Sequence, residues 1–198
     1  MNQLASRGQW AKARQVVSPN QDARPEHEVS LLLLHAISLP PGQFSGHAIE
    51  ALFTNRLVPD AHPFFATIAH LRVSAHLLIR RDGECVQFVD VDQRAWHAGQ
   101  SRWWDPATQA WRTRLNDFSV GIELEGDDQT PFSKAQYASL VEATHWLMAC
   151  YPALTAERIT SHAHVAPLRK TDPGPAFDWA YFRQRLMAAT HDTVKRGE

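Results

Sequence analysis

The sequence contains no segment built for secretion or for a membrane. Residues 1–14 hold no apolar core of the signal-peptide type, which argues against a standard secretory signal. No stretch approaches the ~18 consecutive apolar residues that a membrane helix requires. We therefore expect a protein of the cytoplasm that has no membrane partner.

The sequence also has few cysteines and no excess of basic residues. The 198 residues include two cysteines, Cys85 and Cys150, which we expect to remain free thiols. The formal net charge is -1 and the pI is near 6.8, so nucleic acid is a poor candidate partner. Histidine, by contrast, is plentiful, with 11 residues, and imidazole is the commonest metal ligand.

Length and composition fit one domain. An apolar content of 44% and a charged content of 21% are typical of a soluble globular protein. We predict a single domain over residues 1–198, acting as a monomer, in which residues 1–28 form an N-terminal extension. Within that extension, residues 9–16 indicate a helical turn and residues 19–25 a proline-bounded linker.

Short patterns along the chain predict strands. Apolar runs at 73–80 and 85–91, joined by an Asp-Gly turn, predict a β-hairpin. Alternation in residues 120–126 predicts a strand with Glu123 and Glu125 on one face. The apolar residues 31–34 predict a strand that is buried on both faces.

Helices are predicted between these strands, at 47–55, 133–151 and 178–189. The second helix is expected to begin with Ser133 as its N-cap, and Gln136 three residues later completes a capping box. Strands interspersed with helices indicate an α/β (α+β) domain whose central mixed β-sheet is flanked by helices.

Candidate metal ligands lie in two separate places. His35 follows the buried strand of residues 31–34, at the sheet edge where sites collect. Residues 159–175 combine histidines, a lysine and Asp172 with three prolines, which indicates a rigid loop. On a strand, His162 and His164 would point to one face. A catalytic zinc needs three protein ligands and an open position, and spacing alone leaves His164 and Asp172 as alternatives.

Three further histidines could also act as ligands: His70, His76 and His97. A single histidine in such a position is more often a hydrogen-bonded structural residue than a metal ligand. Spacing therefore does not complete the ligand set.

Seven segments carry a resemblance to a known family. They are His35-Ala-Ile-Ser-Leu-Pro-Pro-Gly, Ala69-His-Leu-Arg-Val-Ser-Ala-His76, Arg80-Arg-Asp-Gly-Glu, Arg94-Ala-Trp-His-Ala-Gly, Asn116-Asp-Phe-Ser-Val-Gly-Ile-Glu-Leu-Glu-Gly, Tyr151-Pro, and Arg169-Lys-Thr-Asp-Pro-Gly-Pro-Ala-Phe-Asp-Trp. Together they resemble the zinc-dependent N-acetylmuramoyl-L-alanine amidases (amidase type 2), and within these the cytoplasmic 1,6-anhydro-N-acetylmuramyl-L-alanine amidases of the AmpD type. Each segment is weak by itself, but seven in order are specific.

The resemblance implies a peptidoglycan-recognition/amidase-like fold with one zinc ion per chain. It implies that His35, His162 and Asp172 bind the zinc, which makes His164 a structural residue. It also makes Glu123 the active-site carboxylate and Lys170 its cationic partner. Two imidazoles and a carboxylate on zinc lower the pKa of a bound water from about 15.7 towards about 7.

The implied reaction cleaves the amide between the lactyl group of 1,6-anhydro-N-acetylmuramic acid and L-alanine. Glu123 would take a proton from the water and return it to the leaving amine. Lys170 would stabilise the oxyanion. The substrates would be anhydro-muropeptides from cell-wall recycling, and their level would indirectly control β-lactamase induction.

The resemblance also suggests substrate contacts. Arg72 and Arg114 match arginines beside the peptide, and arginine suits carboxylate recognition. Ala95 and Trp96 match a groove wall, although surface ion pairs and simple packing would also explain these residues. Two departures from the family stand out. Ala36 replaces a frequent asparagine, and the Gln100–Thr113 connection is unusually long and rich in tryptophan.

Three other functions compete with recycling. An amidase that acts on intact peptidoglycan would share the chemistry but would usually be exported or phage-like. A non-catalytic peptidoglycan-recognition module would lack part of the zinc triad, and all three residues are present here. A muropeptide-sensing regulator has no DNA-binding motif to support it.

Overall fold

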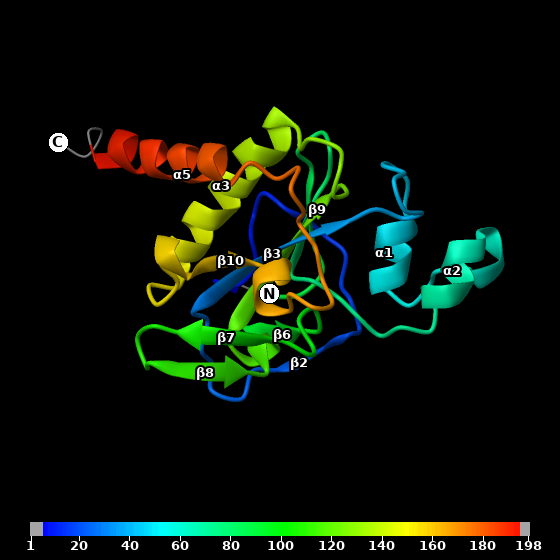
Figure 1. Ribbon diagram of the computed structural model, residues 1–198, viewed down its shortest axis with the longest axis horizontal. Helices are drawn as coiled ribbons and strands as arrows, with labels where there is room; N and C mark the ends of the chain where they lie inside the picture. The colour runs from blue at the N-terminus through cyan, green and yellow to red at the C-terminus, as the bar shows by residue number, and fades with distance from the viewer. Residues whose placement is uncertain (1–5, 195–198) are drawn as a thin grey trace, which may run out of the picture.

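A six-stranded mixed sheet forms the centre of the computed structural model, which describes residues 6–194 (Figure 1). Its strand order is β1-β5-β4-β9-β3-β10. The strands are β1 (Arg14–Gln15), β3 (Leu31–Ile37), β4 (Leu77–Ile79), β5 (Cys85–Gln87), β9 (Ser119–Glu125) and β10 (Ile159–Ser161). β3 pairs in parallel with β9 and β10, and β4 pairs in parallel with β9 but antiparallel with β5. The predicted mixed sheet is confirmed.

The two central strands carry the site and much of the core. In β3, Leu32 and Leu34 pack in one cluster, while Leu31 and Leu33 pack in another on the opposite face. All four leucines are fully buried, which confirms a strand covered on both sides. In β9, alternation places Val120, Ile122 and Leu124 in the first cluster. Its opposite face is thereby left to Ser119, Gly121 and Glu123.

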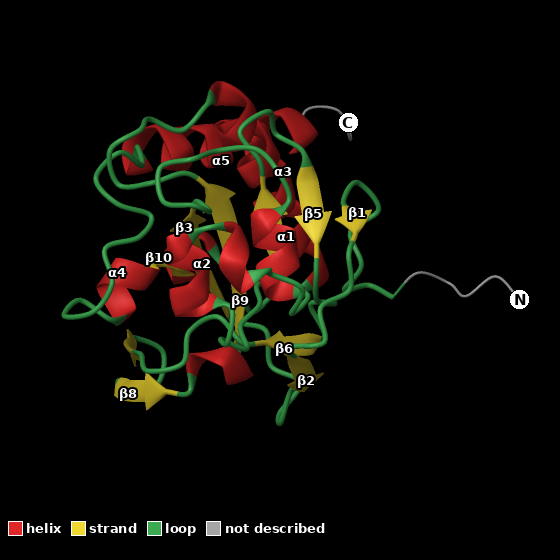
Figure 2. Cartoon of the chain, turned by 90° about the vertical axis from the view of Figure 1, so that its right-hand side faces the viewer, coloured by secondary structure: helices red, strands yellow, loops and turns green. Residues whose placement is uncertain are grey.

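Helices cover both faces of the sheet. α3 (Lys134–Cys150) and α5 (Trp179–Val194) lie together on one side, opposite the small strand pairs (Figure 2). The other face carries α1 (Ala48–Phe53), α2 (Pro63–Ile68) and the short α4 (His162–Val165). Within residues 6–194 there are also three 3-10 turns, at Pro59–Ala61, Leu115–Asp117 and Ala156–Arg158. Among the described residues, no helix is both long and apolar enough to cross a bilayer.

Local signals placed several of these elements correctly. The Ser133 side chain accepts from the Gln136 backbone N–H at 3.0 Å, and the Gln136 side chain accepts from the Ser133 N–H at 3.1 Å. The predicted capping box is therefore present. The hairpin of β4 and β5 also forms, with Gly83 at φ +92° in its turn, although both strands are shorter than predicted. The two cysteines are free thiols.

The N-terminal prediction was wrong in detail. Residues 9–16 form turns followed by β1, and residues 19–25 contain β2 (Gln21–Ala23), which pairs with β6 (Gln93–Ala95). The Trp10 N–H donates to the Gln87 side chain at 2.8 Å, and its ring stacks on Trp146. These long-range contacts outweigh the weak helical preference of an isolated turn.

The long connection at 100–113 is an antiparallel hairpin instead of an open loop. Its strands are β7 (Arg102–Asp105) and β8 (Ala110–Thr113). Trp103 is buried, and Asp105 is 1% exposed and accepts from Arg158 at 3.0 Å. Trp104 and Trp111 remain exposed on the hairpin, with ring centroids 5.7 Å apart.

Candidate metal centre and active site

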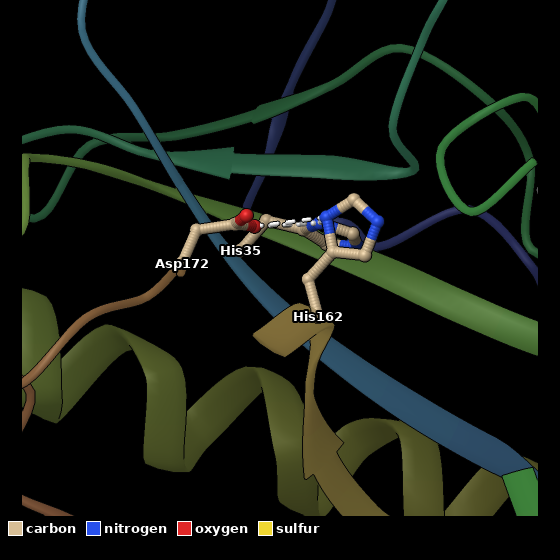
Figure 3. Close-up of side chains that lie close together, drawn as sticks. All are labelled: His35, His162 and Asp172. Atoms are coloured by element: carbon tan, nitrogen blue, oxygen red, sulfur yellow. Dashed lines mark hydrogen bonds and ion pairs between the residues drawn. The ribbon is translucent and has the colours of Figure 1, made fainter. Parts of the chain in front are cut away.

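Three side chains from separate parts of the chain meet at the end of the central strand β3 (Figure 3). His35 is the fifth residue of β3, and His162 is the first residue of α4, directly after β10. Because Ser161 of β10 pairs with Leu34 of β3, the next residue along each strand brings the two imidazoles together. Asp172 comes from the loop after α4, and its carbonyl accepts from the Ala163 N–H at 2.9 Å.

The three side chains present a compact set of ligand atoms. His35 Nδ1 lies 3.0 Å from His162 Nδ1 and 3.1 Å from Asp172 Oδ2, and His162 Nδ1 lies 3.0 Å from the same oxygen. Ligand atoms about 2.0–2.1 Å from a tetrahedral zinc lie about 3.3 Å from one another. The triangle is close to that size, and its two nitrogens and one oxygen are donors that zinc accepts. The residues therefore fit the ion.

The protonation states in this triangle also suit a metal. Burial lowers the pKa of His35 to about 4, against an opposing effect of Asp172, so the imidazole is neutral near pH 7. Burial disfavours ionisation of Asp172, but hydrogen bonds with His162 and His35 outweigh it and hold the carboxyl pKa well below its usual range. A neutral imidazole and an ionised carboxylate are the forms that bind metal.

Glu123 lies beside the triangle on β9. The residue is half-buried, but its Oε2 is shielded from solvent and has no hydrogen-bond partner among the described residues. Desolvation, followed by the negative charge of Asp172, raises the pKa of Glu123 well above 4.5, while Lys170 opposes this shift. A desolvated carboxylate without a partner is costly for a fold, which points to a functional role.

A hollow of about 580 Å³ opens next to Asp172. Ala36 at the end of β3 and Lys170 both line it, so the residue that departs from the family pattern borders the site. The remaining lining residues are Ser38, Gly126, Asp127, Asp128, Gln129, Arg169, Thr171 and Asp172. The hollow therefore reaches the triangle at Asp172, with Lys170 in its wall.

The two histidines at 162 and 164 do not share a face. His162 begins α4, and the Ser161 hydroxyl accepts from the His164 N–H at 3.0 Å as the helix cap. On this helical turn, two residues span about 200°, so the His164 side chain leaves the triangle and is exposed. The expected strand geometry was wrong here, and the loop at 159–175 includes β10 and α4.

The remaining candidate histidines lie outside the triangle. His70 is exposed. His76 is fully buried, accepts from the Gly121 N–H at Nδ1 and contacts Arg24 at Nε2. His97 is half-buried and touches His35 Nε2 with its own Nδ1 at 3.0 Å. Both histidines contact β9: His76 contacts Gly121, and His97 contacts Ser119.

None of the four predicted substrate residues lines the hollow beside Asp172. Ala95 is fully buried in β6 and Trp96 is half-buried beside it. Arg72 is exposed and contacts the carbonyls of residues 69–71, while Arg114 pairs with Asp117 at 3.0 Å. Both guanidiniums thus have partners within their own segments, and their role in binding stays a prediction.

Sequence reasoning missed the residues that surround His97. Ser119 Oγ lies 3.2 Å from His97 Nε2, and a Cβ at Gly121 would lie 2.5 Å from His97 Nδ1. A glycine inside an alternating strand often marks the close approach of another group. Gly121 was therefore a sequence signal that some group approaches this strand closely. Only the fold identifies that group as the His97 ring.

The sequence is similar to those of known proteins. The profile of a family described as N-acetylmuramoyl-L-alanine amidase matches residues 25–175. A 1,6-anhydro-N-acetylmuramyl-L-alanine amidase AmpD of Escherichia coli K12 is 56% identical over 188 residues, which are 94% of this chain and 99% of that protein. The AmpD of Salmonella typhimurium SL1344 is 56% identical over 95% of this chain and 97% of its own length.

Solved structures give the same picture. A crystal structure of a selenomethionine AmpD derivative superposes with a TM-score of 0.86 at 55% identity, covering 93% of this chain and 99% of that one. A complex of the Escherichia coli amidase AmiD with anhydro-N-acetylmuramic acid-L-Ala-D-gamma-Glu-L-Lys reaches a TM-score of 0.57 at 27% identity. It covers 89% of this chain and 60% of that one.

Proposed function

Because this chain belongs to the N-acetylmuramoyl-L-alanine amidase family, we propose that it is a zinc amidohydrolase of cell-wall recycling. Its substrates are anhydro-muropeptides, in which it cleaves the amide between the lactyl group of 1,6-anhydro-N-acetylmuramic acid and L-alanine. The names of its AmpD relatives and the ligand held by AmiD support this substrate class. By consuming such muropeptides the enzyme would also act indirectly on β-lactamase induction.

The observation that carries the proposal is the triangle of His35, His162 and Asp172. Its three ligand atoms lie 3.0–3.1 Å apart, and all three residues of the expected triad are present. A recognition module without catalysis would not need this set together with the shielded Glu123 carboxyl. One zinc ion per chain would be held by these residues and leave a coordination position open.

A zinc ion held by these three residues would supply the acidity that lets water act as a nucleophile near neutral pH. Glu123 would accept a proton from the attacking water at a carboxyl oxygen and return it to the leaving amine of L-alanine. Desolvation raises the pKa of Glu123, which favours holding the proton on this carboxyl between the two transfers. Lys170, which lines the hollow, offers positive charge to the oxyanion.

Four residues outside this hollow would contribute to substrate binding. Arg72 and Arg114 would pair with carboxylates of the peptide stem, and Ala95 and Trp96 would form part of the groove wall. Exposed guanidiniums with weak local partners can change partners at small cost. The enzyme would work in the cytoplasm as a monomer, with no nucleic-acid or membrane partner.

The deciding experiment compares three substrates. These are an anhydro-muropeptide, the same muropeptide with an ordinary reducing end, and intact sacculi, each assayed with and without a zinc chelator. The rigid anhydro ring loses less conformational freedom on binding, so we expect a higher kcat/KM for the anhydro form. The chelator should abolish activity.

Faster cleavage of intact sacculi would instead support an enzyme of the intact wall. Equal kcat/KM values for the two muropeptides would refute recycling but leave the amidase chemistry standing. Full activity in metal-free protein would refute the zinc mechanism.

A further inference from the structure

A line of polar groups runs from the proposed metal triangle into the sheet. His35 Nδ1 faces His162 and Asp172, whereas His35 Nε2 lies 3.0 Å from His97 Nδ1. The far nitrogen of His97, Nε2, lies 3.2 Å from Ser119 Oγ. The order from the triangle inwards is therefore His35, His97 and Ser119.

Only one arrangement of protons along this line leaves the triangle able to bind a cation. A metal at His35 Nδ1 needs the lone pair of that atom, so the ring proton of neutral His35 must lie on Nε2. His97 Nδ1 must then accept this proton in a hydrogen bond. His97 consequently carries its own proton on Nε2, from which it donates to Ser119 Oγ.

The backbone around His97 holds the ring in this orientation. The Asn116 side-chain oxygen accepts from the N–H groups of His97 at 3.2 Å and Ala98 at 2.7 Å. Gly121 leaves the space in which the ring lies, because a Cβ there would approach His97 Nδ1 to 2.5 Å. The Gly121 N–H is itself fixed by His76 Nδ1 at 3.0 Å.

We propose that His97 is a positioning residue, which with Ser119 fixes the tautomer and ring orientation of His35 so that Nδ1 faces the metal. This inference rests on the proposed zinc site. Partners of this kind behind a ligating histidine typically change metal affinity by about 10–100-fold when removed. The other imidazole differs, since His162 Nε2 is buried and has no partner among the described residues.

The test measures zinc affinity of the full-length protein by competition with a chromophoric chelator. His97→Leu removes the acceptor, and we expect its zinc Kd to rise by about 10–100-fold. His97→Asn can keep an oxygen near the position of Nδ1, and we expect it to restore most of the affinity. His145→Leu is the control, because His145 lies on α3, on the opposite face of the sheet, where its Nε2 is 3.0 Å from the Leu186 carbonyl oxygen.

A second readout follows the proton itself. In zinc-loaded protein with 15N-labelled histidine, the His35 Nε2–H should give a slowly exchanging resonance in the wild type and in His97→Asn. The signal should be lost to fast exchange in His97→Leu. Ser119→Ala removes one oxygen and tests the end of the line independently of whether His97→Leu folds. It should weaken zinc binding severalfold and speed the exchange.

The outcomes separate the two claims. If the wild type binds no zinc, the proposed function fails and the positioning role fails with it. If the wild type binds zinc and the folded His97→Leu binds it equally well, only the positioning role is overturned. Equal losses of zinc affinity in His97→Leu and His97→Asn would assign the effect to packing and also overturn the positioning role. An unchanged zinc affinity in Ser119→Ala would overturn it as well.

Discussion

His35 and Glu123 are direct partners in the parallel pairing of β3 with β9. Side chains that are paired in this way point to the same face of a sheet. The proposed metal ligand and the proposed proton carrier therefore leave the sheet side by side. Their spacing is set by the main chain, which is more rigid than a loop, and this favours accurate catalytic geometry.

The identity of the third ligand is open to a direct test. Asp172→Ala should lose the bound zinc and the activity, because one corner of the triangle disappears. His164→Ala should keep close to one zinc per chain, since this side chain is exposed and points away. Metal analysis of both purified variants decides the matter. An empty site in His164→Ala with a filled site in Asp172→Ala would contradict the assignment.

Glu123 and Lys170 should act on the reaction and not on metal retention. Glu123→Gln should keep its zinc while kcat falls by about 10²–10⁴-fold, the usual contribution of a positioned acid or base. Lys170→Ala should lose on the order of 10²-fold or more. Steady-state kinetics with parallel metal analysis would check both values. Loss of zinc from either variant would indicate a ligand role instead.

Metal removal should lower the stability of the fold. A ligand that binds only the native state stabilises it by about 4 kcal/mol at 1,000 times its Kd. Thermal unfolding with excess zinc and with excess chelator should therefore give clearly different Tm values for the wild type. Asp172→Ala serves as the control and should show little response. A wild-type Tm that is the same with zinc and with chelator would argue against specific binding.

An ion-pair network around Glu50, outside the metal triangle, should make stability depend on acid pH. Hydrogen bonds from Arg14 and Arg80 outweigh desolvation and lower the pKa of Glu50 to about 2, below its unfolded value of about 4.5. The folded state then binds fewer protons, so this stabilisation is fully present above pH 4.5 and is lost as the pH falls towards 2.

Glu50→Gln should accordingly lower the unfolding free energy at pH 7 by at most about 3 kcal/mol, with the difference shrinking below pH 4.5. Urea denaturation of metal-free protein at several pH values measures this difference. Glu26→Gln, at an exposed carboxylate, is the matched control. A difference for Glu50→Gln that does not change between pH 7 and pH 3 would refute the assignment.

Elements with strong local signals could be predicted from the sequence by itself. The capping box of Ser133 and Gln136 defines the start of α3, and the alternation in β9 assigns Glu123 to its face. The Asp-Gly turn likewise determines the β4–β5 hairpin. Each of these signals depends on residues within a few positions of one another. The order of the seven motifs also indicated the family and, through it, the three expected metal ligands. These ligands lie together in the structure.

Only the tertiary structure decided which distant groups meet. Residues 14–15 and 21–23 became strands because edges of other strands were free to pair with them. His164 left the site because the chain turns into a helix at His162. His97 reached His35 because glycine at 121 leaves room above β9. Such contacts depend on strand register between segments far apart in the chain, and local residue patterns do not determine that register.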